Sequence, residues 1–456
     1  MLEGHIQVAK VHSQPYLWEG GLNMEQSPRQ QIDFIVRSLE EKGTPAAPVV
    51  EATSLAISHP EAVSDLAIAV MRRFPKGGTF LDAALSYLPQ EDWPALVQYA
   101  LDALDESGVK SFNAVGSIIA YASLQSPSAL HPHLSRIFLG RPNERCYYER
   151  FPWRESGDLH FHYLRGVIEG TASTADARTR AWADMCETRH AKVIEYAISC
   201  ADLSGLSPTG WSQEEWVTSS LHLVGFHHEG HSLQRTCPEA LYHLQFSDSY
   251  FESQSRPLWL ARIHPTWKLS TSTPVFPFGG TSTNRCSLCG EKLHRLLVLD
   301  PVPVGLGITR LTRLELATCL SCLGWERQPL FYRHDQDGCP SNVGYDGPAV
   351  KPQFPVGPLK ETETRLAETP RRWYWQDWGL SNGRQNLNRI GGEPCWIQNA
   401  EYPQCPSCQR LMPYLMQLDS ELPTVDGGEW LWGSGGIGYG FWCDRCKVSG
   451  FFWQCT

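Results

Sequence analysis

Four C-x2-C motifs in two pairs constrain this chain more than any other sequence feature. Cys286-Ser-Leu-Cys289 is followed by Cys319-Leu-Ser-Cys322, and Cys405-Pro-Ser-Cys408 is followed by Cys443-Asp-Arg-Cys446. A C-x2-C turn presents two thiolates to one side of a metal ion, and a second turn can complete a tetrahedral site. We therefore predict two metal sites, each with four cysteine ligands.

Zinc is the expected ion, one per site, in a zinc-ribbon-like arrangement. Four thiolates leave no open coordination position, so both sites are expected to be structural and not catalytic. Iron–sulfur ligation, redox-active thiol pairs and disulfides are the alternatives. Residues 290–318 and 409–442 separate the two motifs of each pair. Because these segments are longer than the ~15–20 residues of compact zinc ribbons, tertiary structure has to close each site.

The layout around the two sites indicates an internal duplication. In each copy an apolar, strand-like run follows the first motif and ends in an aspartate, Asp300 or Asp419, 11 positions after the second cysteine. A Gly-Gly pair precedes each copy, at Phe278-Gly-Gly280 and Ile390-Gly-Gly392. The C-terminal half is therefore expected to be mainly β and duplicated.

The N-terminal half has helical periodicity. Ile32, Ile35, Val36 and Leu39 recur at helical spacing, and similar segments continue to about residue 200, separated by Gly- and Pro-containing breaks. Short helices with tight turns suggest a helical repeat, which we describe as HEAT-like, while an irregular helical bundle is the alternative. The predicted fold class is thus α+β, with a helical domain before the duplicated β-rich domain.

The predicted organisation has five parts. They are a flexible leader (1–23), an α-helical domain (24–206), a first β-rich copy with a four-cysteine site (207–347), a linker (348–372) and a second β-rich copy with a four-cysteine site (373–456). Translation could start at Met1 or at Met24. Strands are expected at 241–246 and 258–261.

Composition limits the classes of function. Hydrophobic residues make up 42% of the 456 residues and the net charge is −10, which argues against a chain-wide nucleic-acid or membrane interface but leaves a local basic patch possible. No apolar run is long enough to cross a membrane, and the N-terminus has no apolar signal-peptide core. We therefore expect a cytoplasmic protein, where a reducing environment keeps thiols free to bind metal.

Several weaker motifs have more ordinary interpretations. His227 and His231, with Glu229, have the spacing of a metal box, but H-E-x-x-H is not met and Gly230 disfavours a helix, so a polar loop is expected. Gly433-Ser-Gly-Gly-Ile-Gly438 precedes an apparent strand, so we interpret it as a hairpin approach and not as a phosphate loop. Gly379-Leu-Ser-Asn-Gly383 is expected to form a turn and not a nucleophile elbow. Asp300 and Asp419 are expected to cap turns, although a carboxylate pair could do acid–base chemistry.

Residues from about 220 to 456 resemble the YwqG-like family, a bacterial domain of unknown function. The resemblance is carried by Ile390-Gly-Gly-Glu-Pro-Cys-Trp-Ile-Gln398, by Met416-Gln-Leu-Asp-Ser420, and by Trp432-Gly433 with Gly438-Tyr439. Phe278-Gly-Gly280 and Leu299-Asp300 look like their degenerate counterparts in the first copy. The family implies a duplicated, strand-rich fold without established catalysis. Some members lie beside toxins, which implies immunity roles, and simpler members lack the cysteine motifs.

These observations favour a non-catalytic, zinc-stabilised protein-binding module of a bacterial cytoplasmic protein, acting as an immunity or adaptor protein. The partner would be another protein, such as a toxin, and neither membrane nor nucleic acid is expected. An uncharacterised metal-dependent hydrolase using the His227–His231 region or the Asp300/Asp419 pair is one alternative. A nucleic-acid-binding zinc-ribbon protein is the other.

Overall fold

The computed structural model describes residues 27–42, 46–74, 81–107, 114–140, 151–201, 210–230, 232–251, 274–343, 347–381 and 385–456. The expected leader at 1–23 and the expected strand at 258–261 lie outside these ranges. The predicted α+β fold class is confirmed, because helices fill the N-terminal half and an antiparallel sheet fills the C-terminal half. In the described ranges, no helix is both long and apolar enough to cross a membrane.

Eleven α-helices of the described ranges precede the sheet. They are α1 (Pro28–Lys42), α2 (Ala46–Ser58), α3 (Val63–Arg73), α4 (Asp82–Leu85), α5 (Trp93–Ser107), α6 (Ala114–Gln125), α7 (Leu134–Leu139), α8 (Phe161–Glu169), α9 (Ala175–Glu187), α10 (Ala191–Cys200) and α11 (Gln213–Leu223). Capping residues fix some of the starts. Thr174 accepts a hydrogen bond from the Ala177 N–H, and Ser212 and Glu215 form a capping box at the start of α11.

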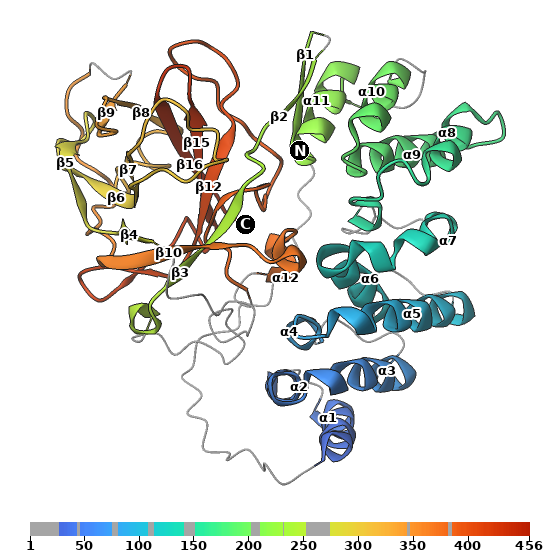
Figure 1. Cartoon of the computed structure of the whole chain (residues 1–456). Helices are drawn as coiled ribbons and strands as arrows, with labels where there is room; N and C mark the ends of the chain where they lie inside the picture. Colours follow the sequence, from blue (N-terminus) through green and yellow to red (C-terminus); the bar gives the residue numbers. More distant parts are fainter. Residues whose placement is uncertain are drawn as a thin grey trace.

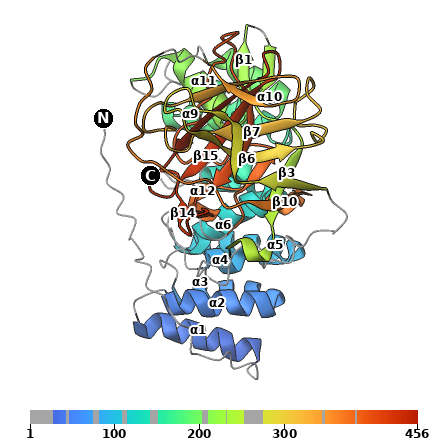
Figure 2. The ribbon, with the colours of Figure 1, turned by 90° about the vertical axis from the view of Figure 1, so that its left-hand side faces the viewer.

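The helices stack in chain order into a column that runs alongside the β half (Figure 1). A view turned by 90° shows α1 and α2 at the far end of this column, away from the sheet (Figure 2). Two apolar cores lie inside it, one under α1–α6 and one under α7–α11. Stacking in sequence order agrees with a helical repeat, and the HEAT-like assignment stays a prediction.

The helical half extends further along the chain than the boundary predicted at 206/207. Trp216 of α11 packs on Trp182 of α9 with ring centroids 3.9 Å apart, and Leu221 belongs to the same core. A small hairpin, β1 (Phe226–Glu229) with β2 (Ser232–Arg235), follows α11. Helix α11 therefore belongs to the helical half, because its apolar residues are buried against other helices. The main sheet begins only at β3.

The main sheet has 12 strands and contains both predicted copies. Its strands are β3 (Leu241–Phe246), β4 (Val275–Phe278), β5 (Thr281–Arg285), β6 (Lys292–Leu299), β7 (Leu314–Thr318), β8 (Leu330–His334), β9 (Pro340–Asn342), β10 (Thr362–Glu368), β11 (Arg389–Gly391), β12 (Tyr414–Asp419), β15 (Ile437–Cys443) and β16 (Val448–Gln454). A separate pair joins β13 (Leu422–Pro423) to β14 (Glu429–Trp430). The strand order is β5-β6-β4-β10-β3-β11-β12-β15-β16-β8-β9, with β7 on β6.

The sheet curls until its two ends nearly meet. Tyr332 of β8 accepts a hydrogen bond from the Cys319 N–H that follows β7, and its hydroxyl lies 3.2 Å from the Thr318 hydroxyl. At the other seam the Asn284 amide donates to the Pro340 carbonyl at 2.6 Å. Isolated hydrogen bonds thus connect edges that no strand ladder joins.

The prediction of a linker at 348–372 was wrong for residues 362–368. These residues form β10, which pairs with β3 on one side and β4 on the other. Thr364 and Leu366 face the core while Glu363 is exposed. The charged residues on the outer face gave this strand the composition of a linker, but its alternate side chains are buried.

The two Gly-Gly pairs occupy matching places in the sheet. Gly279 directly follows β4 and lies against the segment that leads into β10. A Cβ at Gly279 would lie 2.2 Å from the Lys360 carbonyl oxygen. Gly391 ends β11 beside the chain entering β3, where a Cβ would lie 1.8 Å from the Ala240 carbonyl oxygen. All four glycines have positive φ, so they permit both the conformation and the close approach.

The segment after β10 joins the β half to the helices. Arg372 donates to the carbonyl oxygens of Ser86 and Leu88, and Leu380 of the short helix α12 (Trp378–Ser381) packs in the core of α1–α6. Residues 373–381, expected to open the second β-rich copy, therefore pack against helices. Their apolar side chains find their partners across the domain boundary.

Candidate metal centre

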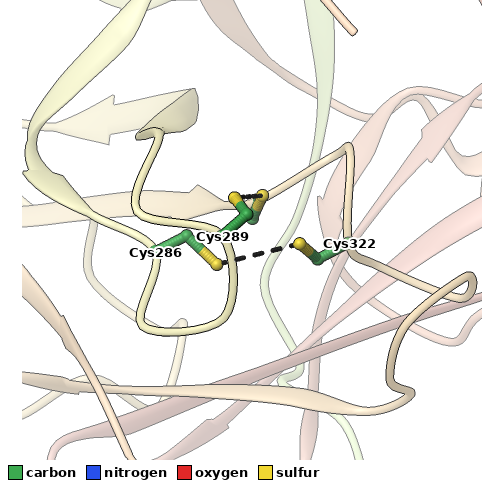
Figure 3. A group of neighbouring side chains, drawn as sticks. Cys286, Cys289 and Cys322 are labelled. Atoms are coloured by element: carbon green, nitrogen blue, oxygen red, sulfur yellow. Dashed lines mark hydrogen bonds between the residues drawn. The ribbon is translucent and has the colours of Figure 1, made fainter. Parts of the chain in front are cut away.

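The first four-cysteine site lies at one end of β6. Cys286 and Cys289 belong to the turn between β5 and β6, and Cys319 and Cys322 follow β7, which pairs with β6. The Cys286 and Cys322 sulfurs are 4.0 Å apart and those of Cys289 and Cys319 are 3.7 Å apart (Figure 3). Pairing of β6 with β7 thus brings together motifs that the sequence separates widely.

The second site repeats this arrangement around β12 and β15. Cys405 and Cys408 lie in the turn before β12, Cys443 ends β15, and Cys446 lies in the turn leading to β16. The Cys408 and Cys443 sulfurs are 3.7 Å apart. In both sites all four sulfurs lie within 4.8 Å of one another. All eight predicted ligands are therefore gathered into the two predicted sets.

The sulfur distances fit metal ligation and exclude disulfides. A tetrahedral zinc site with Zn–S bonds of ~2.3 Å places its sulfurs ~3.8 Å apart. A disulfide requires about 2.05 Å. The measured distances of 3.7–4.0 Å agree with the first value, and all eight cysteines are free thiols.

Both sites use the same turn at their first motif. The Cys286 N–H donates to the Glu291 carbonyl and the Cys405 N–H to the Arg410 carbonyl, each at 2.8 Å. The residue after the second cysteine, Gly290 or Gln409, donates its N–H to the first cysteine's carbonyl and has φ of +77° or +59°. This left-handed residue reverses the chain so that both thiolates point to one side.

Burial and hydrogen bonding shift the pKa of the cysteine thiols. Cys286, Cys319, Cys322 and Cys405 are at most 2% exposed, whereas Cys289 is partly exposed. Hydrogen bonds with the Cys319 and Cys322 thiols lower the pKa of Cys286. Burial raises the pKa of Cys408, but the Arg410 backbone and the three neighbouring thiols outweigh it and bring the pKa to about 7. One thiolate in each set is favoured in this way, whereas hydrogen bonding to Cys286 raises the pKa of Cys319 and Cys322, and burial raises the pKa of Cys443 and Cys446.

The segment around His227 does not form the helix that a metal-binding histidine box would need. Phe226–Glu229 is strand β1, so His227 and Glu229 lie on a hairpin, and His231 lies outside the described residues. The His227 Nδ1 atom is 3.1 Å from Nε2 of His222, and burial and His227 lower the pKa of His222 to about 4. Across the described ranges, the two cysteine sets are the groups of three or more metal-binding side chains. This histidine pair has no third ligand among them.

The other weak motifs have structural roles. Gly433–Gly438 leads into strand β15 and not into a helix, as expected. Ser381 ends α12 and is fully buried, with its hydroxyl on Gln385, while 382–384 lie outside the described residues. Asp419 accepts the Ser420 N–H at 2.9 Å, which agrees with the expected cap, whereas Asp300 is exposed and lies 3.9 Å from Arg313.

Sequence reasoning missed a buried ionic network between the two halves. Arg189, just after α9, donates to both carboxylate oxygens of Glu393 and also pairs with Glu187, which in turn accepts from Arg154. The Trp375 ring lies under Arg189 at 4.5 Å. These residues are spread from 154 to 393, so no local motif marks them. The positive φ of Arg189, 56°, is visible only in the structure.

A second buried polar cluster lies in the sheet itself. The His243 ring contacts Thr369 at 2.8 Å and Gln376 at 3.0 Å, and Arg389 donates to Cys395 at 3.1 Å. Gln417 accepts the Cys395 N–H at 2.9 Å. Two small hollows of the described chain each have room for about 10 Å³, roughly one water molecule, and neither is lined by this cluster. The cluster therefore cross-links strands.

Comparisons with known proteins add little about function. A protein of Salmonella typhimurium described as "Uncharacterized protein YpfL" is 26% identical over 180 residues, which cover 38% of this chain. The match spans about 39% of that protein's own length. No family model matches the chain, and no solved structure matches it.

Proposed function

We propose that each four-cysteine set holds one structural zinc ion in a bacterial cytoplasmic protein whose role is to bind another protein. The observation that carries this proposal is the pair of four-cysteine clusters, in each of which all four sulfurs lie within 4.8 Å of one another. Four soft ligands and no oxygen or nitrogen donor are the set that zinc takes in structural sites. Iron–sulfur ligation remains the competing use of such a set.

A binding role is favoured over catalysis by the same geometry. A catalytic zinc needs a position for water or substrate, and here the four cysteine sulfurs of each set would occupy all four positions of a tetrahedral zinc ion. The His222–His227 pair has no third ligand within the described residues, which weakens the metal-dependent hydrolase. We assign the chain to immunity or adaptor proteins, with a protein such as a toxin as partner, and the resemblance to the YwqG-like family supports this assignment.

Metal content tests the zinc sites. Protein purified under reducing conditions without a metal-affinity step is expected to contain two zinc ions per chain by elemental analysis. Cys405→Ser should lower this to one. Cys455→Ser is the matched control, because Cys455 lies outside both sets. Iron in place of zinc, or no metal at all, would contradict the proposal.

The binding role needs a separate test. The candidate partner is the product of the gene beside this one, co-expressed with this protein and assayed for a stable complex. If that product is toxic, co-expression is expected to restore growth, and Cys405→Ser to abolish the rescue while Cys455→Ser keeps it. Rescue that depends on neither zinc site would separate the binding role from the metal.

A further inference from the structure

The two cysteine sites differ in the charge that surrounds them, although their backbones match. Arg410 occupies the turn position that Glu291 occupies in the first site, since each carbonyl accepts the N–H of the first cysteine. Inside and just after the second motif, Arg445 and Lys447 stand where the first site has Ser321 and Leu323. Three positions thus carry cations in the second site where the first has an acidic or an uncharged residue.

Two further arginines join this group from other elements. Arg333 of β8 donates to the Ser407 hydroxyl inside the first motif at 2.9 Å, and Arg310 donates to the Arg445 carbonyl at 3.4 Å. Strand β8 lies beside β16 (Figure 1), and in this pairing Arg333 is opposite Val448. We call this set the basic rim. Its members are Arg310, Arg333, Arg410, Arg445 and Lys447.

The basic rim is exposed, and its five cations outnumber the two nearby carboxylates, Asp444 and Asp335. The four arginines are exposed and Lys447 is partly so. Among the described residues, none of the five forms an ion pair with a carboxylate. Asp444 lies in the rim, but its oxygens accept from the Thr309 N–H and from the Trp442 ring N–H. Asp335 lies nearby and accepts the Cys339 N–H at 2.8 Å.

The need to balance the negative charge of a metal-bound thiolate set does not account for five cations. A zinc ion with four thiolates carries a charge of about −2, and this charge is the same in both sites. The first site is surrounded by both signs, with Arg285 and Lys292 beside Glu291. The larger excess of positive charge thus lies at the second site, in a chain whose net charge is −10.

We propose that the basic rim of the second site is the docking surface for an acidic segment of the protein partner. This inference rests on the proposed binding role and adds the face and the chemistry of the partner. Exposed cations held on a rigid turn attract a short anionic segment, and screening over ~8 Å keeps the repulsion by distant carboxylates small. Docking there would place the partner on the sheet.

A protein segment fits the basic rim better than a nucleic acid. Binding of single strands uses exposed aromatic rings on which bases stack. Trp442, the ring that contacts the rim through Asp444, is 3% exposed. A long polyanion would also meet the negative charge of the remaining surface.

The test measures binding of defined probes to the full zinc-loaded chain by fluorescence anisotropy. The probes are a labelled peptide of alternating Glu and Gly, the same peptide with Gln for Glu, and a single-stranded oligothymidine. The acidic peptide is expected to bind, and its affinity is expected to fall as NaCl is raised from about 0.05 to 0.3 M. Its affinity for the Arg410→Glu/Arg445→Glu variant is expected to be lower by roughly tenfold or more. Arg410→Lys/Arg445→Lys should keep binding.

Lys292→Glu/Lys351→Glu is the matched control at the first site. It changes the net charge by the same amount, at two exposed residues. Lys351 lies near the first site because its neighbour Val350 donates its N–H to the Leu288 carbonyl inside the first motif. Equal losses in the two charge reversals, no binding of the acidic peptide, or tighter rim-dependent binding of oligothymidine would each overturn the inference. Zinc content is measured in every variant, so an absent metal, which contradicts the zinc sites, is distinguished from a failed docking surface.

Discussion

Arg189 binds Glu393 through two nitrogens across 204 positions of sequence, and this contact joins the helical half to the sheet. The Arg189 Nη2 atom lies 2.7 Å from Glu393 Oε2, and the two side chains are 7% and 9% exposed. A bidentate guanidinium–carboxylate pair fixes orientation as well as distance. The pair therefore sets how the helical column sits against the β half.

Breaking this pair should destabilise the protein strongly. Arg189→Met removes the close partner of the buried Glu393 carboxylate and leaves Arg235, 3.8 Å away, as its ion-pair partner among the described residues. We expect the free energy of unfolding to fall by about 3 kcal/mol in urea titrations. Arg165→Gln is the control, because the Arg165–Glu169 pair lies on an exposed helix surface and its loss should leave the unfolding midpoint unchanged. Equal effects of the two substitutions would show that the buried pair has no special role.

Acid should destabilise the sheet through His243. Burial, followed by the nearby Arg389 charge, lowers the pKa of His243 from 6.5 to about 3. The unfolded chain therefore takes up a proton at a pH where the folded protein does not. The stabilising contribution is fully present above pH 6.5 and is lost as pH falls from 6.5 towards 3, amounting to roughly 3 kcal/mol between pH 7 and pH 4.

His243→Asn isolates this contribution. Other groups, including the cysteine ligands, titrate in both proteins, so the difference between the two pH profiles of unfolding reports His243. The variant is expected to be less stable at pH 7, because the contacts to Thr369 and Gln376 change, and to lose less stability on acidification. Parallel pH profiles would rule out His243 as the acid-sensitive group.

The two cysteine turns offer opposite substitutions at matching positions. Gly290 has φ of +77° with nothing within 4 Å of its would-be Cβ, so Gly290→Gln should cost about 1 kcal/mol through conformation alone. Gln409 already tolerates φ of +59°, so Gln409→Gly should stabilise by about 0.5 kcal/mol. Thermal unfolding of zinc-loaded protein measures both effects. Changes of the same sign would contradict the matching of the two turns.

Gly391 is expected to tolerate no side chain. Gly391→Ala would place its Cβ 1.8 Å from the Ala240 carbonyl oxygen, so β11 and β3 would have to separate, at a cost of at least about 3 kcal/mol. Gly157→Ala is the control, because its φ is similarly positive at +62° but nothing lies within 4 Å. Denaturant titration should show that Gly157→Ala lowers the free energy of unfolding by about 1 kcal/mol. A small effect at Gly391 would mean that the strands can shift.

The sequence alone determined the two halves and the composition of the two four-cysteine sets. Helical periodicity at Ile32 and Ile35 and the C-x2-C spacing are local signals, because a helix face and a two-thiolate turn form within a few residues. The Gly-Gly pairs were equally local, since only glycine adopts their φ without cost. Assignments of this kind need no knowledge of distant partners.

Only the tertiary structure decided how these parts combine. Strand β10 has the composition of a linker until β3 and β4 bury Thr364 and Leu366, and Arg189 has no recognisable role until Glu393 lies beside it. The basic rim also appears only after folding, because Arg310 and Arg333 are far from residue 410 in the sequence. Burial and charge depend on neighbours that the chain brings together across long separations, and local pattern does not encode them.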